Sequence, residues 1–129
     1  MRSFGTVSGQ LRIASFSAEE DFDELFEAFA AVVDEGGAFP RTSPVDAETF
    51  RAAWLDGMTT VQVARRDGEL AGSYFLRPAF PDLGSHIANA GYLVVPPLRR
   101  QGIGRLLAEH SMAEAQRHGF DAMVRRRLE

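Results

Sequence analysis

Apolar residues recur along this chain at two spacings, and each spacing predicts a kind of element. Over 11–16 (LRIASF), apolar and polar residues alternate as they do in a half-buried strand. Over 18–34, apolar residues recur every three or four positions and predict an amphipathic helix: Phe22, Leu25, Phe26, Phe29, Val32 and Val33. Ser17 and Glu20 form the Ser-x-x-Glu capping pattern at its start, and Gly36 and Gly37 predict its end.

A second helix and a hairpin are predicted next. Residues 35–44 have the Gly and Pro content of a loop, and Asp46 can cap a helix that reaches Asp56. Its predicted apolar face carries Phe50, Ala53 and Trp54. Strands over 59–66 and 69–78 flank Asp67-Gly68, which is the strongest short-range signal for a β-hairpin.

The last third of the chain predicts a strand, a helix and a strand. Residues 80–97 begin as a loop and become a strand over 90–95 that stops at Pro96. A helix over 103–118 ends at Gly119, and 120–124 (FDAMV) is the last strand candidate. Small residues are expected to pack this helix on a sheet: Gly104, Ala108, Ser111, Met112, Ala115 and Gly119. The order β-α-α-β-β-β-α-β predicts an α/β fold with a mixed sheet flanked by helices.

Length and composition indicate one domain over 1–129. Residues 1–10 are expected to be a flexible or edge segment, and 125–129 an exposed tail. No run of 18 apolar residues and no basic-then-apolar leader occurs, so neither a transmembrane helix nor a signal peptide is predicted, and no membrane partner. The absence of Cys excludes disulfides, Cys-ligated zinc and a thiol nucleophile, which fits a cytoplasmic protein.

Charge is distributed unevenly along the chain. The formal net charge is −4, which argues against a nucleic-acid partner. Residues 19–56 hold eleven acidic residues against two arginines, whereas from 99 onward there are seven arginines and four acidic residues. The basic half could hold an anion, and a solvated arginine surface explains it equally well. All 14 basic residues are Arg, so lysine nucleophiles, Schiff bases and Walker lysines are excluded.

The segment 96–107 (PPLRRQGIGRLL) carries the strongest chemical signal. Its prolines end a strand, Gly102 and Gly104 allow a ligand to approach the backbone, and a helix begins with unpaired amides. These features suit the binding of a phosphate or pyrophosphate. A tight strand-to-helix turn with solvated arginines and no ligand would show the same sequence pattern. A P-loop requires a lysine, and a dinucleotide fingerprint would need a third glycine where Leu107 stands.

Arg99-x-x-Gly102-x-Gly104, between a strand ending YLVVPP and a helix ending HGF, resembles the coenzyme A site of the GCN5-related N-acetyltransferase (GNAT) family. The predicted element order from residue 11 to 124 is similar to the fold of that family. The resemblance implies an acetyl-CoA co-substrate, no metal, and direct attack by a primary amine of a small molecule or peptide. It implies that main-chain groups of Leu93, Val94 and Val95 bind the pantetheine arm. The pyrophosphate would bind the segment of Arg99, Arg100, Gln101, Gly102, Ile103 and Gly104.

The catalytic groups implied by the resemblance are less well matched. Family members often carry a glutamate on the fourth strand, near the positions of Ala88, Asn89 and Ala90. His86 is the candidate general base because its ordinary pKa suits neutral pH, and a loop histidine bonded to the backbone is its alternative. Asn89 is the candidate that orients a water or a substrate carbonyl, and a turn residue at the strand end is its alternative. Phe39 and Pro40 correspond to a region that walls the acceptor site in relatives, and a simple hydrophobic plug is equally consistent with them.

The C-terminal third departs from the family pattern. GNAT domains usually continue after the fifth strand with a helix and two strands, whereas here FDAMV is followed by RRRLE. The sequence therefore predicts a truncated domain whose fifth strand has an open edge, completed by a second copy or a partner segment. An alternative to the enzyme is a CoA-binding module with impaired turnover. A third interpretation is an α/β interaction domain whose glycines serve packing only.

Overall fold

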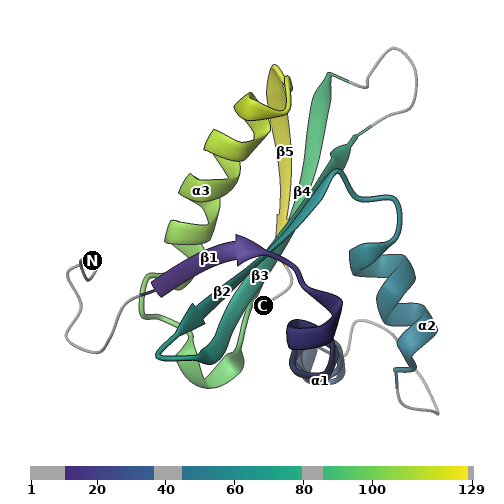
Figure 1. Ribbon diagram of the computed structural model, residues 1–129, viewed down its shortest axis with the longest axis vertical. Helices are drawn as coiled ribbons and strands as arrows, with labels where there is room; N and C mark the ends of the chain where they lie inside the picture. Colours follow the sequence, from purple (N-terminus) through teal and green to yellow (C-terminus); the bar gives the residue numbers. More distant parts are fainter. Residues whose placement is uncertain (1–10, 37–44, 80–85, 128–129) are drawn as a thin grey trace.

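The fold was analysed in a computed structural model that describes residues 11–36, 45–79 and 86–127 (Figure 1). The predicted order of elements is confirmed throughout these residues. The strands are β1 (Leu11–Ser15), β2 (Thr60–Arg66), β3 (Glu69–Pro78), β4 (Ile87–Val94) and β5 (Ala122–Arg127). The helices are α1 (Ala18–Gly36), α2 (Ala47–Phe50) and α3 (Ile103–Arg117), with a π-helical turn over Arg51–Leu55 and a 3₁₀ turn over Pro96–Leu98.

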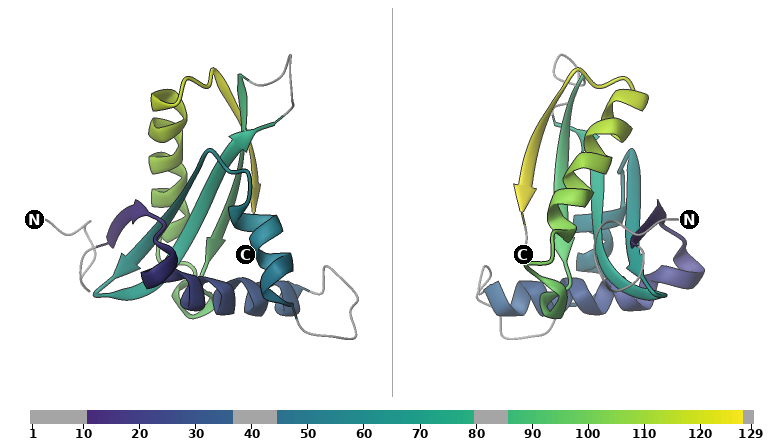
Figure 2. Two further views of the ribbon diagram at one scale, coloured as in Figure 1. Left: turned by 45° about the vertical axis from the view of Figure 1, so that its right-hand side comes forward. Right: turned by 90° about the vertical axis from the view of Figure 1, so that its left-hand side faces the viewer.

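The five strands form one mixed sheet in the order β1-β2-β3-β4-β5. The pairs β1–β2, β2–β3 and β3–β4 are antiparallel, and the pair β4–β5 is parallel. The α/β class with a mixed sheet is therefore confirmed. The parallel pair requires a crossover, and α3 supplies it by carrying the chain back along the sheet (Figure 2).

The two faces of the sheet carry separate hydrophobic cores. On one face, α3 packs Ile103 and Leu107 against the side chains of Tyr74, Ala90 and other residues of the central strands. On the other face, α1 and α2 bury an aromatic cluster against the same strands: Phe29, Phe50, Trp54 and Phe75. Every second residue of β3 and β4 thus contributes to one core, because successive side chains of a strand point to opposite faces.

The start of α1 differs from the predicted capping pattern. The amide of Ser17 donates to Asp21 Oδ2 at 2.8 Å, so Asp21 takes the place expected for Glu20. Arg65 of β2 explains the choice, since it donates to Asp21 Oδ1 at 2.8 Å and pairs with Glu24 at 2.7 Å. The buried Asp21 therefore joins the helix start to the sheet, whereas Glu20 points to solvent.

The segment of α2 and the following π-helical turn is anchored as predicted, except that Ala53 does not lie on the apolar face. Asp46 Oδ1 accepts the amide of Thr49 at 2.8 Å and begins α2. Phe50 and Trp54 are buried, and Trp54 Nε1 donates to Ser73 Oγ of β3 at 3.0 Å. Ala53 is exposed rather than on the apolar face, because Arg51–Leu55 continues as a π-helical turn that widens the residue spacing.

The packed face of α3 also differs from the expected row of small residues. Its buried residues are Ile103, Leu107, Ser111 and Ala115, spaced four apart, whereas Met112 is 46% exposed. Gly104 and Ala108 are half-buried beside this row, and Gly119 lies beyond the helix. The buried row is therefore large at the start of α3, with Ile103 and Leu107, and small toward its end, with Ser111 and Ala115.

β5 continues through Arg127, although 125–129 were expected to lie outside the strand. Arg125, Arg126 and Arg127 pair with Ala90, Gly91 and Tyr92 of β4. In the sheet described here β5 has a single neighbour, so the predicted open edge is present, and its completion by a second copy or a partner segment stays a prediction. The expectations for 1–10, Phe39 and Pro40 fall outside the described residues. Among the helices that the structure describes, none is long and apolar enough to cross a membrane.

Two tyrosines of the central strands pair their hydroxyls with α3. Tyr74 Oη lies 2.6 Å from His110 Nδ1, and Tyr92 Oη lies 2.6 Å from Ser111 Oγ. Both tyrosines belong to the core beneath α3, so their packing role is as expected for strand tyrosines. Burial, and to a lesser extent Glu114, raises the pKa of Tyr74 well above its ordinary value near 10. Tyr74 therefore stays protonated in the folded protein at pH values where an unfolded tyrosine ionises.

This shift predicts how stability responds to alkaline pH. Tyr74→Phe should lower the free energy of unfolding by about 1 kcal/mol below pH 10, the usual net value of one hydrogen bond. Above pH 10 the unfolded wild type loses protons that the folded protein keeps, so the advantage of the wild type over Tyr74→Phe should shrink. Urea unfolding of both proteins between pH 8 and 11 measures this difference in the free energy of unfolding. A constant difference across this range would show that Tyr74 ionises equally in both states.

Candidate functional site

The segment between β4 and α3 forms a tight turn of unusual backbone conformation. Pro96–Leu98 make a 3₁₀ turn, and Arg99 then returns to an extended conformation with φ −65° and ψ 156°. Arg100 has φ 67° and Gly102 has φ 83°, so two of the next three residues are left-handed. Successive amides of such a turn can form a concavity that binds anions.

Within the described residues, the amides of the second half of this turn have no acceptors. The first intrahelical bond of α3 runs from the Leu106 amide to Gly102 O at 3.1 Å, and Gly102 at the N-cap has no side chain to cap the helix. None of the amides from 100 to 105 has an acceptor within the part of the chain that the structure describes. The dipole of the 15-residue helix adds partial positive charge at the same end. The turn therefore offers a row of donors to an anion.

Two arginines bring further donors to this turn. Arg99 Nη1 pairs with Glu35 Oε1 of α1 at 2.7 Å, whereas its Nε and Nη2 are buried without a partner. Arg66, at the end of β2, donates from Nη1 to Gln101 Oε1, and its Nε is also buried without a partner. Of the four buried side-chain polar atoms without a partner among the described residues, three are arginine nitrogens of this region.

Gly104 leaves room beside the turn. A Cβ built at this position would meet only Val94 Cγ2, at 3.7 Å, which is an ordinary contact. Packing within the described chain therefore does not require glycine here, although glycine inside a helix costs up to about 1 kcal/mol relative to alanine. The backbone at Gly104 is instead left open to a ligand that approaches the start of α3.

At the end of β4, the main-chain groups of successive residues face opposite neighbours. The amide of Val95 donates to Ala71 O at 2.9 Å, and the amide of Ala79 donates to Ile87 O, so odd-numbered residues of β4 face β3. Even-numbered residues face β5, whose last pairing is Tyr92 with Arg127. The amide and carbonyl of Val94 therefore face the β5 side of the strand, beyond the last pairing that the structure describes. Leu93 and Val95, predicted with Val94, direct their main-chain groups to β3 instead.

Asn89 lies on the opposite face of β4 from α3. It pairs with Arg77 of β3 and Val124 of β5, and odd-numbered side chains of this strand point toward α1 and α2. Its Oδ1 is buried, and no donor from the described residues reaches it. An unpartnered buried carbonyl destabilises the fold by about 1–3 kcal/mol, which makes Asn89 a candidate for contact with a substrate.

His86 is not brought to the turn. It is exposed in the turn before β4, where its main-chain oxygen accepts the amide of Asp121 at 2.8 Å. Along the strand it lies about 26 Å from Val94, at roughly 3.3 Å per residue, whereas Asn89 lies about 16 Å away. His86 also precedes the first residue of β4, whereas Asn89 lies within the strand, and the catalytic roles of both stay predictions.

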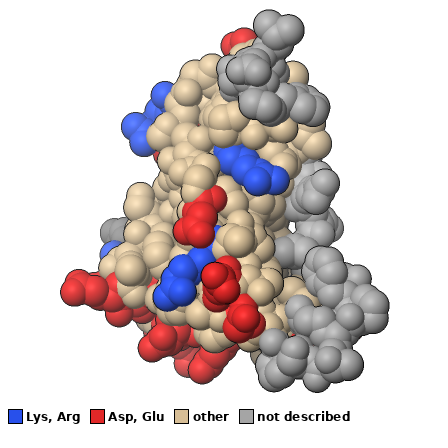
Figure 3. Space-filling view, turned by 90° about the vertical axis from the view of Figure 1, so that its right-hand side faces the viewer, with Lys and Arg blue, Asp and Glu red and all other residues tan. Residues whose placement is uncertain are grey.

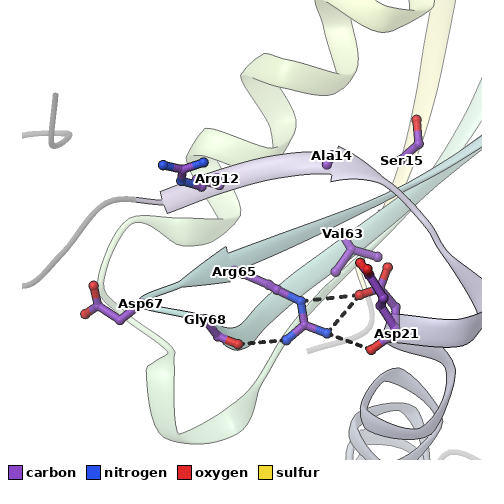
Figure 4. A pocket seen from close by; sticks show the side chains of 9 residues that line it. Arg12, Ala14, Ser15, Asp21, Val63, Arg65, Asp67 and Gly68 are labelled. Atoms are coloured by element: carbon purple, nitrogen blue, oxygen red, sulfur yellow. Dashed lines mark hydrogen bonds and ion pairs between the residues drawn. The ribbon is translucent and has the colours of Figure 1, made fainter. Parts of the chain in front are cut away.

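One hollow away from this turn is lined by an ion pair of the protein itself. A cavity of about 490 Å³ between β1 and the start of α1 is lined by Arg12, Asp21 and Arg65 among others. There Arg65 donates to Asp21, to Glu20 O and to Gly68 O, so its guanidinium is fully engaged (Figure 4). Acidic side chains gather over the end of the molecule where α1 lies (Figure 3). No group of three metal-ligating side chains is found among the residues that the structure describes.

Arg66 is the residue of this site that the sequence did not indicate. It precedes the Asp67-Gly68 turn, where an arginine in a hairpin ordinarily points to solvent. It is instead only 8% exposed, because its side chain lies on the face that α3 covers. The alternation of β2 places Arg66 on the same face as the buried Ala64, which was the one signal available.

Comparison with known proteins gives a consistent result. Residues 19–126 match the model of the acetyltransferase (GNAT) family. An N-acetyltransferase of Schizosaccharomyces pombe is 38% identical over 81 residues, which are 63% of this chain. The chain spans only 37% of the length of that yeast protein.

Solved structures resemble the fold closely. A GCN5-related N-acetyltransferase from Kribbella flavida superposes with a TM-score of 0.76 at 27% identity, over 88% of this chain and 69% of its own. A ribosomal-protein-alanine N-acetyltransferase from Brucella melitensis superposes with a TM-score of 0.73 at 27% identity, over 88% of this chain and 72% of its own. A Salmonella typhimurium acetyltransferase determined with its cofactor acetyl-CoA gives 0.74 at 22% identity, over 89% and 68%, which shows the shared fold alone.

Proposed function

The chain belongs to the acetyltransferase (GNAT) family, and from that membership we propose that it transfers an acetyl group from acetyl-CoA to a primary amine. The acceptor nitrogen attacks the thioester carbonyl carbon, the carbon–sulfur bond breaks, and CoA leaves as its thiolate. The nitrogen gives up a proton to a base or to water, and the thiolate takes one from solvent. The protein contributes the binding and orientation of both reactants.

The observation that carries this proposal is the excess of donors at the β4–α3 turn. Amides from 100 to 105 and three arginine nitrogens have no acceptor within the described residues. A diphosphate such as that of CoA supplies several charged acceptors in a compact group, and hydrogen bonds to charged acceptors are the stronger ones. The residues that would bind it are those predicted: Arg99, Arg100, Gln101, Gly102, Ile103 and Gly104.

The pantetheine arm would bind along the open edge of β4. Val94 presents both an amide and a carbonyl there, which suits the amide groups of an arm that adds as a short strand. Leu93 and Val95 support this edge by holding β4 to β3. An acyl group that extends along β4 from this point reaches the level of Asn89 before that of His86. We therefore assign Asn89 to the orientation of the acceptor or of a water, and His86 as the base stays a prediction.

The acceptor is a small-molecule or peptide amine. The similarity to an enzyme named for the alanine of ribosomal proteins supports a peptide amine. The acidic residues of α1, gathered at one end of the molecule, would attract a positively charged acceptor.

The first test is turnover of acetyl-CoA with a panel of amines, including peptides with N-terminal alanine. We expect thiol release that depends on the amine and equals the acetylated product found by mass spectrometry. Because the chain has no Cys, a thiol reagent reports CoA alone. A thermal shift with CoA but no amine-dependent release would support a CoA-binding module instead. Absence of both would contradict any role in CoA chemistry.

Gly104→Ala should change stability and cofactor affinity in opposite directions. The new Cβ has room in the free protein and favours the helix, so the free energy of unfolding should rise by about 0.5–1 kcal/mol. The same Cβ would obstruct the diphosphate, so the Kd for CoA should increase. Urea unfolding and calorimetric titration measure the two effects. Gln116→Ala, an exposed change near the other end of α3, is the control that should leave CoA binding unaltered. Unchanged affinity in Gly104→Ala would place the diphosphate elsewhere.

Asn89→Ala should reduce kcat and leave the fold intact. Its Oδ1 has no partner among the described residues, so its removal should cost little free energy of unfolding. Loss of a group that orients a reactant should lower kcat about 10- to 100-fold, with little change in the KM for acetyl-CoA. Steady-state kinetics measure both constants, and Arg77→Ala, its exposed cross-strand neighbour, is the control. An unaltered kcat in Asn89→Ala would remove Asn89 from the site.

A further inference from the structure

We propose that Arg66 is a positioning residue for the β4–α3 turn, acting through the side chain of Gln101. The inference rests on the proposed function, because it assigns a purpose to a residue outside the predicted binding segment. Arg66 belongs to β2, and 35 positions separate it from Gln101 in the chain, yet its Nη1 donates to Gln101 Oε1. The contact therefore joins the far end of the hairpin to the turn that would bind the diphosphate.

Burial shows that the contact is built into the fold. Arg66 is 8% exposed, on the side of the sheet covered by α3, and its backbone pairs with Leu11 on one side and Glu69 on the other. A register shift between Ala64 and Arg65 lies just before it. Irregularities of this kind increase the local twist and redirect side chains at the ends of strands. Arg66 thus emerges from a strand end that is paired on both sides, which makes it a fixed point for a neighbouring turn.

The turn requires such a fixed point. Gln101 stands between Arg100 at φ 67° and Gly102 at φ 83°. A left-handed arginine is strained by about 1–2 kcal/mol, so this conformation persists only where the surroundings hold it. Arg99 is tied to Glu35 of α1 on one side of the turn, and Gln101 is tied to Arg66 on the other. These two bonds fix the direction in which the free amides point.

The free energy of unfolding distinguishes a positioning role of Arg66 from a purely structural role. A buried guanidinium is costly unless it is paired, and Arg66 has a neutral amide as its partner and an Nε without any partner among the described residues. Replacing a poorly compensated buried charge by an apolar side chain is often neutral or stabilising. A residue kept for stability alone would lower the free energy of unfolding when replaced, whereas Arg66 should not.

Arg66→Met, Gln101→Met and the double variant test this inference by calorimetric titration with CoA. Each single variant should raise the Kd for CoA about tenfold, the worth of one hydrogen bond to a charged group. The double variant should bind no more weakly than the weaker single variant, because both changes remove the same bond. The KM for acetyl-CoA should rise in parallel with the Kd. Hydrogen exchange of the peptide 98–106 without ligand should be faster in all three variants.

The controls make each result decisive. Arg117→Met removes an exposed arginine at the far end of α3 and should leave the Kd unaltered. Gln101 is exposed, so Gln101→Met should fold even if Arg66→Met does not. Wild-type affinity in Gln101→Met, or additive losses in the double variant, would overturn a role through Gln101. Failure of the wild type itself to bind CoA would overturn the proposed function and this inference with it.

Discussion

The main constraint on this structure is the set of hydrogen-bond donors at the β4–α3 turn that have no acceptor in the described chain. A helix cannot pair its own first amides, and the described chain supplies no acceptor for those from 100 to 105. Arg99 and Arg66 add buried nitrogens without partners to the same region. A fold that gathers so many donors without acceptors is only fully satisfied when an anion is bound. The diphosphate of CoA, the ligand that we propose for this turn, would offer acceptors to the amides and to Arg99 in a single group.

In the proposed reaction, the cofactor would bind at the end of β4 and the acceptor on the sheet face that carries Asn89. β4 has β3 on one side and β5 on the other, and the last described pairing with β5 is that of Tyr92. The period of two then turns the main chain of Val94 toward the β5 side and points Asn89 to the face of α1 and α2. Cofactor and acceptor can therefore approach one strand from different directions. The cores on both faces keep that strand rigid.

The local pattern of the sequence predicted the elements well, because helix and strand periods, Asp67-Gly68 and Pro96 are short-range signals. What it missed depends on contacts between distant segments. Asp21 replaced Glu20 at the start of α1 because Arg65 approaches from 44 residues away. Val94 differs from its neighbours only through the register with β3, which no single strand encodes. Arg66 became part of the site because α3 covers it, and its sequence neighbourhood shows nothing but a hairpin.

The most direct test is a titration of the isotope-labelled protein with CoA, followed by its backbone amide resonances. If the turn binds the diphosphate, the largest saturable changes should occur at the amides from 100 to 105 and at Val94. Smaller changes should follow along β4 toward Asn89. The account would be contradicted if no amide changed saturably, or if the largest changes lay around Arg12 and Arg65 between β1 and α1.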